Sequence, residues 1–340
     1  MVDATHISFT ANDRSYFSLI KKEIHRIAQE TGLNAVRLNE LDLIVAEITS
    51  NLYKYSDDGE ILMGVFENGG SPYIEIISID NGPGMMNPAR MMQDGISTSK
   101  TLGHGLGSIK RLSDDFDLYS QTGWGTVLLS RIYHDAKKAK ALSAELILSP
   151  IVVSKPGETK SGDGFTFKKT DKYLKIMLAD GLGHGPEANK AVNEAAEAFK
   201  VFPDYSPTDT LRFLHQSIKK TRGAVINIIC YEYSTKLWTT AGVGNISVRL
   251  LGPTTLRNHL CYNGIVGHNM PGTMSDLQFR AEEYNQVMLC TDGIRTRIDL
   301  AKYPQMSKYD QTIFAAAIYK DHARKTDDMS VVLAKIAKDD

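Results

Sequence analysis

A short run rich in alanine and lysine, Asp135–Leu142 (DAKKAKAL), separates two differently patterned parts of this chain. Before it, helix-like and strand-like segments alternate with glycine-rich loops, and after it strand-like segments predominate. The run favours a short connecting helix and is too polar to form a core. The length of 340 residues also fits two domains at about 150 residues each. We therefore predict domains at 1–134 and 145–340, joined by a linker at 135–144.

The composition narrows the class of protein. The chain has 39 Lys and Arg against 40 Asp and Glu, a net charge of -1, and 42% hydrophobic residues, which is typical of a neutral globular protein. This balance disfavours a nucleic-acid binder that relies on bulk positive charge. Cys230, Cys261 and Cys290 form no close pair, so neither a disulfide framework nor a zinc knuckle is expected. Because no apolar run approaches the roughly 18 residues of a membrane span, we expect a soluble, cytoplasmic protein.

The N-terminal part combines a polar helix face with glycine-rich loops. A helix predicted from about Asn39 to Tyr53 places Glu47 and Asn51 four residues apart, so both side chains point the same way. A predicted hairpin then ends in Asp80-Asn81-Gly82-Pro83-Gly84, where a carboxylate follows a strand and glycines permit close approach of a ligand.

A second glycine-rich segment, Gly103-His104-Gly105-Leu106-Gly107, precedes another predicted helix. Glycine-rich backbone at a helix N-terminus is suited to bind phosphate through unpaired N–H groups. Each feature alone is more commonly an ordinary turn or surface group. Together and in this order they indicate a nucleotide pocket.

These residues, with the run STSKTLGHGLGSIKRLSDDFDLYSQTGWGT, resemble the GHKL ATP-binding fold, and most of all the RsbT/RsbW serine kinases of bacterial stress signalling. The resemblance covers about residues 5 to 134 and implies ATP and Mg²⁺ as cofactors. It implies that Glu47 activates the attacking hydroxyl and that Asn51 holds the metal on the phosphates. It also implies an adenine contact at Asp80, a loop with Gly82 and Gly84, a phosphate lid with Gly103, Gly105 and Gly107, and a position near the adenine for Thr126.

The same resemblance suggests partners. Dimerisation helices with a phospho-accepting histidine are not evident before residue 39, which argues against a histidine autokinase. Serine kinases of this family transfer phosphate to a partner protein, typically a STAS-domain antagonist. RsbW-type relatives also sequester a sigma factor, and family members often form homodimers.

The C-terminal part carries four separated acidic patterns, and three of them begin or end a strand-like run. They are Ser161-Gly162-Asp163-Gly164, Ala179-Asp180-Gly181, Thr291-Asp292-Gly293 and Asp327-Asp328-Met329. Carboxylates at adjoining strand ends can converge, and like charges at short range need cations to neutralise them. Oxygen ligands suit Mg²⁺ or Mn²⁺ rather than zinc. The alternative for each Asp-Gly pair is an ordinary turn.

These patterns resemble the metal-dependent serine/threonine phosphatases of the SpoIIE/RsbX type over about residues 145 to 338. The resemblance implies a pair of Mn²⁺ or Mg²⁺ ions bridged by the catalytic Asp180. It implies Asp163 or the Gly181 carbonyl as a ligand at one metal, and Asp292 and Asp327 at the other. Asp327 is preferred over Asp328 because the family ligand is the first residue of this pattern. His184 is left outside the core site.

The expected fold is α+β in two domains: an N-terminal GHKL (Bergerat) α/β sandwich and a C-terminal PPM-type β-sandwich flanked by helices. The expected function is a signalling switch that phosphorylates and dephosphorylates STAS-domain partners. One alternative is a phosphatase regulated by a nucleotide-binding GHKL domain. Others are a module that sequesters a sigma factor, and a scaffold of two degenerate domains.

Overall fold

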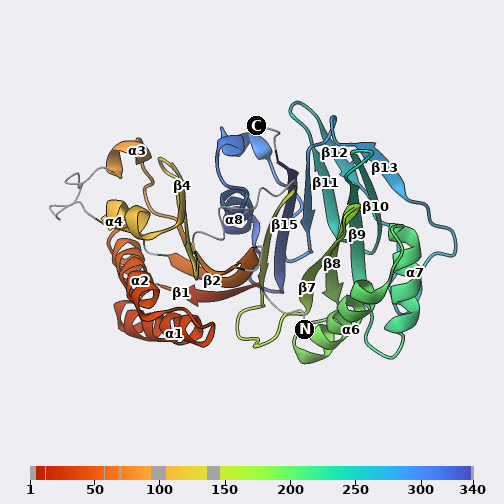
Figure 1. Ribbon diagram of the computed structural model, residues 1–340, viewed down its shortest axis with the longest axis horizontal. Helices are drawn as coiled ribbons and strands as arrows, with labels where there is room; N and C mark the ends of the chain where they lie inside the picture. The colour runs from red at the N-terminus through yellow and green to blue at the C-terminus, as the bar shows by residue number, and fades with distance from the viewer. Residues whose placement is uncertain are drawn as a thin grey trace. The chain divides into compact units, whose positions relative to one another are not determined.

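The computed structural model describes residues 5–11, 13–56, 58–68, 71–92, 105–135 and 146–337. These form two compact units, each of which is described by itself (Figure 1). The first unit takes the described residues of His6–Ser143 together with Tyr303–Ala317. The second takes those of Met1–Thr5, Ala144–Lys302 and Ile318–Asp340. The predicted linker lies outside the described residues except for Asp135, so the predicted domain boundaries stay a prediction.

The first unit contains an antiparallel sheet in the order β1-β2-β3-β5-β4. Its strands are β1 (His6–Thr10), β2 (Gly59–Asn68), β3 (Ser71–Asp80), β4 (Asp115–Gln121) and β5 (Gly125–Tyr133). The helical elements of this part are η1 (Arg14–Tyr16), α1 (Phe17–Glu30), α2 (Ala35–Tyr55), α3 (Pro88–Met91) and α4 (Gly105–Leu112). The apolar stripes of α1 and α2 pack with Ile61, Ile74 and Ile76 of the sheet in one core.

Helix α2 begins four residues earlier than the sequence pattern predicts. Its first residue is Ala35, and the side chain of Asn34 accepts hydrogen bonds from the backbone N–H groups of Val36 and Arg37 at 3.0 and 3.1 Å. Asparagine at this position satisfies N–H groups that the helix itself leaves unpaired. The added turn lengthens the helix that carries Glu47 and Asn51.

The second unit stacks two antiparallel sheets, ordered β13-β10-β9-β8-β7 and, among its own strands, β12-β11-β14-β15-β6. The first sheet contains β7 (Asp163–Lys169), β8 (Tyr173–Gly181), β9 (Ala224–Glu232), β10 (Leu237–Val243) and β13 (Leu277–Arg280). The second contains β6 (Leu146–Val153), β11 (Ser247–Leu251), β12 (Leu256–His259), β14 (Gln286–Cys290) and β15 (Met329–Ile336). The short helical turn η2 (Leu300–Lys302) follows β14 in the chain, whereas the next turn, η3 (Met306–Lys308), belongs to the first unit.

Strand β8 shows how the layers form. Ile176 and Leu178 join the core shared with Val248 and Val332 of the other sheet. The intervening Met177 packs instead with residues of α6 (Pro186–Val201) and α7 (Pro207–Ser217), which cover the outer face of this sheet (Figure 1). Alternate residues of a strand point to opposite faces, so one strand supplies both cores.

Helix α8 (Gln311–His322) is not predicted by the sequence pattern. Every residue from Ile313 to Tyr319 is both apolar and buried, so this stretch has no solvent-facing side. A helix that is apolar on all sides shows no 3.6-residue alternation. Its sequence is therefore hard to distinguish from that of a buried strand.

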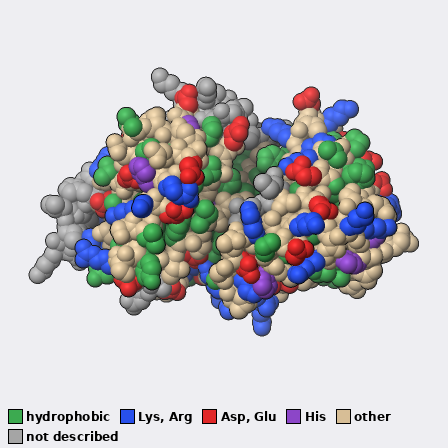
Figure 2. Space-filling view, turned by 90° about the horizontal axis from the view of Figure 1, so that it is seen from below, with side chains coloured by type: hydrophobic (Ala, Val, Ile, Leu, Met, Phe, Trp, Pro, Cys, Tyr) green, Lys and Arg blue, Asp and Glu red, His purple; other side chains and the backbone are tan. Residues whose placement is uncertain are grey.

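The predicted α+β class with two architectures is confirmed: helices cover one sheet in the first unit, and the second unit is a helix-flanked β-sandwich. No helix among the described residues combines the length and apolar character needed to cross a membrane. On the face shown in Figure 2, acidic and basic side chains are interspersed, and no continuous basic stripe is visible among the described residues. This distribution matches the near-zero net charge.

Candidate functional site

In the first unit, α2 and the start of α4 bring Glu47, Asn51 and Gly105 together. A Cβ atom at Gly105 would lie 2.9 Å from Glu47 Oε2 and 3.6 Å from Asn51 Oδ1. The glycine therefore lets the α4 backbone approach the two polar side chains that the helical spacing predicts on one face. The arrangement puts a carboxylate, an amide and the N-terminal turn of a helix at one place.

Asp80 lies at the end of β3, opposite Thr126 of β5. Its Oδ1 accepts hydrogen bonds from the backbone N–H of Gly82 at 2.8 Å and of Thr126 at 3.2 Å. Gly84 has φ +68°, and a Cβ there would lie 1.8 Å from the carbonyl oxygen of Gln121. The loop after β3 thus needs glycine both for its backbone conformation and for close packing.

Ser120 on β4 is a contributor that the sequence reasoning missed. Its hydroxyl donates to the Gly125 carbonyl at 2.8 Å and accepts from the Met85 N–H at 2.9 Å. The backbone N–H of Gly123 also donates to the carbonyl of Pro83 at 2.8 Å. The β4–β5 hairpin therefore holds the loop that follows Asp80. A serine in a strand gives no signal of this role without the pairing partners.

Some residues of the predicted nucleotide site lie apart from these contacts. Gly107 is buried within α4. Gly103 and the segment 94–100 lie outside the described residues. The structure thus forms two groups in the first unit: Glu47, Asn51 and Gly105 in one, and Asp80, Gly82 and Thr126 in the other.

In the second unit, four of the predicted metal ligands line one cavity of about 360 Å³. They are Asp180, Gly181, Asp292 and Asp327. The other lining residues are Leu182, Gly183, Val225, Gly244, Asn245, Asn263 and Gly264. Acidic residues separated by more than 140 positions in the sequence therefore face one space.

Asp163 lies beside this cavity, paired in register with Asp180 across β7 and β8. Its Oδ2 accepts hydrogen bonds from the hydroxyls of Thr291 at 2.7 Å and Ser330 at 2.6 Å. Burial raises the pKa of the Asp163 carboxyl, while these hydroxyl donors oppose the rise. No pattern in the sequence singles out Thr291 or Ser330.

The chemistry of these donors fits a divalent cation. Burial, followed by repulsion from Asp163 and the other carboxylates, raises the pKa of Asp180 well above its ordinary value. A bound cation relieves such repulsion, and carboxylate and carbonyl oxygens are ligands that Mg²⁺ and Mn²⁺ accept. In the part of the chain that the structure describes, no three acidic, His or Cys side chains already converge at ligand distance around one point.

The structure separates Asp327 from its neighbour. Asp328 is 3% exposed and accepts hydrogen bonds from the backbone N–H groups of Lys155 and Gly162, both at 2.8 Å. Asp327 lines the cavity instead. Asp328 thus holds the loop before β7, whereas Asp327 faces the space in which a ligand would bind.

Asn245 and His184 complete the description. The Asn245 amide donates to Asp292 Oδ2 at 3.1 Å, so it orients a predicted ligand. His184 is half-exposed and its Nδ1 lies 2.7 Å from Glu158 Oε1, while its place outside the core site stays a prediction.

Comparison with known proteins identifies both regions. Residues 9–131 match the family described as the histidine kinase-like ATPase domain. A stretch of 100 residues is 37% identical to the serine/threonine-protein kinase RsbT of Bacillus subtilis and covers 29% of this chain and 75% of that protein. The chain belongs to the RsbT family. The RsbT-like region is thus confirmed by sequence similarity well beyond a single motif.

This RsbT family member is also similar to phosphatases. It is 28% identical over 102 residues to the phosphoserine phosphatase RsbX of Bacillus subtilis, covering 30% of this chain and about half (51%) of that protein. A structure of RsbX in complex with magnesium superposes with a TM-score of 0.50 at 21% identity, covering 58% of this chain and 98% of that one, which shows the fold. A chain from work on the bacterial stressosome gives a TM-score of 0.51 at 25% identity, covering 56% of this chain and all of that one. The expected resemblance of this chain both to RsbT-like kinases and to RsbX-like phosphatases is confirmed.

Proposed function

We propose that this chain is a signalling switch with two opposed activities, and that both act on a STAS-domain partner in bacterial partner switching. Its kinase region would transfer phosphate from ATP to a serine or threonine, and its phosphatase region would remove it. The observation that carries the proposal is the presence, in one chain, of two separate groups of residues with complementary chemistry. A cytoplasmic setting and assembly into a homodimer belong to the same proposal.

In the kinase region, we assign Glu47 as the base that accepts the proton of the attacking hydroxyl. Asn51 would hold Mg²⁺ against the phosphates, and the N-terminal turn of α4 at Gly105 would contact them. Asp80 would accept a hydrogen bond from the adenine amino group, with Thr126 beside it. Phosphoryl transfer needs mainly positioning and charge neutralisation, so these few groups suffice.

In the phosphatase region, we assign Asp180 as the bridging ligand of a pair of Mg²⁺ or Mn²⁺ ions. Asp292 and Asp327 would hold one ion, and Gly181 or Asp163 the other. Such a pair activates water at neutral pH and neutralises phosphate oxygens. The residues of this chain orient the ligands: Asn245 through Asp292, and Thr291 with Ser330 through Asp163.

The test is a time course of intact-mass measurements on candidate STAS proteins incubated with the full chain, ATP and Mg²⁺ or Mn²⁺. We expect Asp180→Asn to accumulate a partner heavier by one phosphate, because addition continues without removal. Glu47→Gln should add no phosphate but should still strip a partner that was phosphorylated beforehand.

Two outcomes would contradict the proposal. If Glu47→Gln adds phosphate as fast as the unsubstituted chain, Glu47 is not the base. If the chain phosphorylates one partner yet removes phosphate only from another, the two activities do not form one switch. Stable capture of a sigma factor without phosphate transfer would favour sequestration instead.

A further inference from the structure

The first compact unit includes a segment from far along the chain. Tyr303–Ala317 belongs with the RsbT-like residues, although in sequence it lies between the proposed metal ligands Asp292 and Asp327. Within this segment Tyr303, Met306 and Thr312 are each less than 9% exposed. The segment is therefore an integral part of the unit that contains the nucleotide site.

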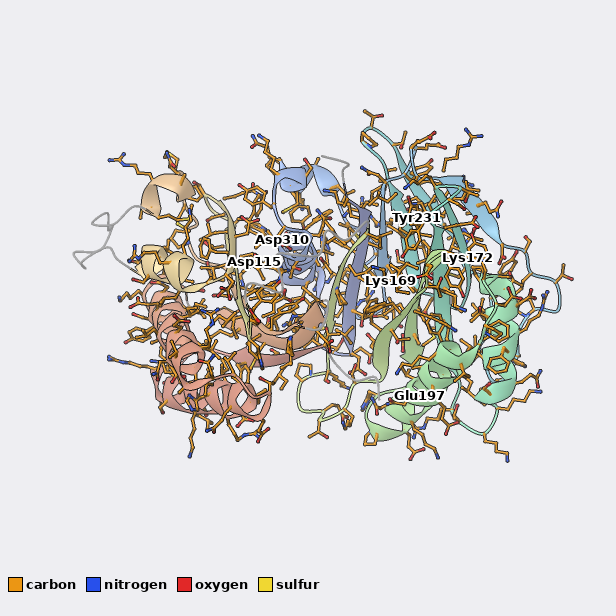
Figure 3. The ribbon with its side chains drawn as sticks, viewed as in Figure 1. Asp115, Lys169, Lys172, Glu197, Tyr231 and Asp310 are labelled. Atoms are coloured by element: carbon orange, nitrogen blue, oxygen red, sulfur yellow. The ribbon has the colours of Figure 1, made fainter. Side chains whose placement is uncertain are left out.

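A buried ionic group anchors the segment to β4 and β5. The guanidinium of Arg131 donates to both carboxylate oxygens of Asp310, at 2.7 and 3.2 Å, and to the Thr312 hydroxyl at 2.8 Å. The Asp310 N–H donates to Asp117 Oδ2 at 2.7 Å. The Asp115 carboxylate also lies near this group, with Oδ2 4.0 Å from an Arg131 guanidinium nitrogen. Figure 3 labels Asp115 and Asp310 at this place. Two-pronged contacts of this kind fix geometry as well as charge.

Aromatic contacts continue the attachment toward the tip of the β4–β5 hairpin. Tyr309 packs edge-on against Tyr119 with ring centroids 5.0 Å apart, and Tyr303 packs edge-on against Trp124 at 6.4 Å. The Tyr119 hydroxyl donates to the Pro304 carbonyl at 3.4 Å. Without the segment, the rings of Tyr119 and Trp124 would lose these partners on one side.

The same hairpin tip contacts Asp80, the residue proposed to bind the adenine, and the loop that follows it. Trp124 stands between Gly123, whose N–H donates to the Pro83 carbonyl, and Gly125, where a Cβ would lie 2.1 Å from the Asp80 carbonyl oxygen. Tyr119 precedes Ser120, which holds the Met85 N–H. The residues that the segment contacts are therefore adjacent in the sequence to those that hold the loop after Asp80.

We propose that residues 303–312, which come from the phosphatase half of the sequence, position the adenine end of the kinase nucleotide site. Tyr309 and Asp310 act as positioning residues: they touch no nucleotide but hold the β4–β5 hairpin in its binding conformation. A hairpin that is already ordered before the ligand arrives loses less conformational entropy on binding. This inference rests on the proposed use of ATP by the first unit.

The test compares full-length variants in ADP binding by calorimetry and in ATP kinetics. Tyr309→Ala should weaken ADP binding on the order of three- to thirtyfold, the range expected for loss of indirect coupling. The KM for ATP should rise while kcat stays close to that of the unsubstituted chain. Tyr309→Phe keeps the ring and should restore binding. Lys308→Ala is the matched control, since Lys308 is exposed and its Nζ contacts Gln305 of the same segment at 3.2 Å.

Hydrogen exchange on the unsubstituted chain gives an independent reading that needs no variant. ADP should slow exchange at the amides of residues 305–312, because binding and ordering of the hairpin are reciprocally coupled. Unchanged ADP affinity in Tyr309→Ala, or no change of exchange in this segment on ADP binding, would overturn the inference alone. Failure of the unsubstituted chain to bind ADP would overturn the proposed kinase function and this inference with it.

Discussion

Asp163 and Asp180 face each other across β7 and β8, yet only one of the two carboxylates lines the cavity. The hydroxyls of Thr291 and Ser330 hold Asp163, while Asp180 shares the cavity with two further aspartates. The two strands thus give neighbouring acidic residues different surroundings. One carboxylate is stabilised by the protein, and the other is left for a cation to stabilise.

This difference predicts the effect of Asp180→Asn. The variant should resist heat better than the unsubstituted chain without metal, because one repelling charge is gone. It should lose most of the stabilisation that Mn²⁺ or Mg²⁺ confers. Phosphatase activity should fall at least about 100-fold, which is the upper end of the cost of replacing a residue that only supports a metal ligand. Melting curves with and without metal measure both effects.

Asp328→Asn serves as the contrast for that experiment. Asp328 accepts two backbone hydrogen bonds, so its substitution should lower the melting temperature without metal. Much of the response to metal should remain. If Asp180→Asn kept the full metal response, Asp180 would not be a ligand.

Two glycines of the β4–β5 turn offer a matched pair. Gly123 and Gly125 both have positive φ, at +77° and +110°, so alanine is strained at either position. A Cβ at Gly125 would lie 2.1 Å from the Asp80 carbonyl oxygen, whereas a Cβ at Gly123 meets no atom within 4 Å.

Gly125→Ala should therefore abolish ADP binding measured by calorimetry. Gly123→Ala should bind with an affinity within about threefold of the unsubstituted chain, since it carries the strain without the collision. Equal loss in both variants would mean that strain, not the contact with Asp80, decides binding.

A buried ion pair makes the first unit sensitive to acid. Burial by itself would raise the pKa of the Glu75 carboxyl, but Arg131 and His6 hold it below its ordinary value of 4.5. The stabilisation is therefore present above pH 4.5 and is lost as the pH falls through the lower folded-state value. Glu75→Gln should reduce the free energy of unfolding at pH 7 by about 3 kcal/mol, because it leaves part of the charge of Arg131 uncompensated. In this variant the free energy of unfolding should also fall less steeply as the pH is lowered.

Urea titrations between pH 7 and pH 3 measure this effect. The fluorescence of Trp124 in a Trp238→Phe background reports on the first unit, since these are the two tryptophans of the chain. If the free energy of unfolding falls as steeply with acid in Glu75→Gln as in its parent, other carboxylates control acid unfolding.

Lys175 predicts a further rise of stability with pH, in the alkaline range. Its side chain is fully buried on β8, donates to the Asp204 carbonyl at 2.8 Å and lies 5.0 Å from the ring of Phe199. Burial lowers the pKa of its ammonium group from 10.5 to about 8. Between these values the unfolded chain binds more protons, so this group makes the free energy of unfolding rise with pH by roughly 2–3 kcal/mol.

Lys175→Met should remove that rise, which urea titrations at pH 7, 8, 9 and 10 would detect. Trp238 fluorescence in a Trp124→Phe background reports on the second unit. The comparison of variant and parent cancels the titration of tyrosines and cysteines present in both. Parallel pH profiles of the two proteins would refute a lowered pKa for Lys175.

Local patterns account for much of the fold. The spacing of apolar residues predicts α2, because this helix has one face against a core and one toward solvent. Helix α8 escapes this reasoning because its surroundings are apolar on every side. The capping side chain of Asn34 shows why helix ends are harder to predict than helix interiors.

The sequence by itself determined which chemical groups this protein has: a carboxylate and an amide on one helix face, glycine-rich loops, and aspartates at the ends of strands. These follow from periodicities of a few residues. Only the tertiary structure decided that Asp180, Asp292 and Asp327 line one cavity, that Asp163 and Asp328 are occupied by hydrogen bonds, and that Tyr303–Ala317 belongs with the first unit. The reason is physical: long-range contacts depend on strand pairing and burial across the whole chain, and no local pattern records them.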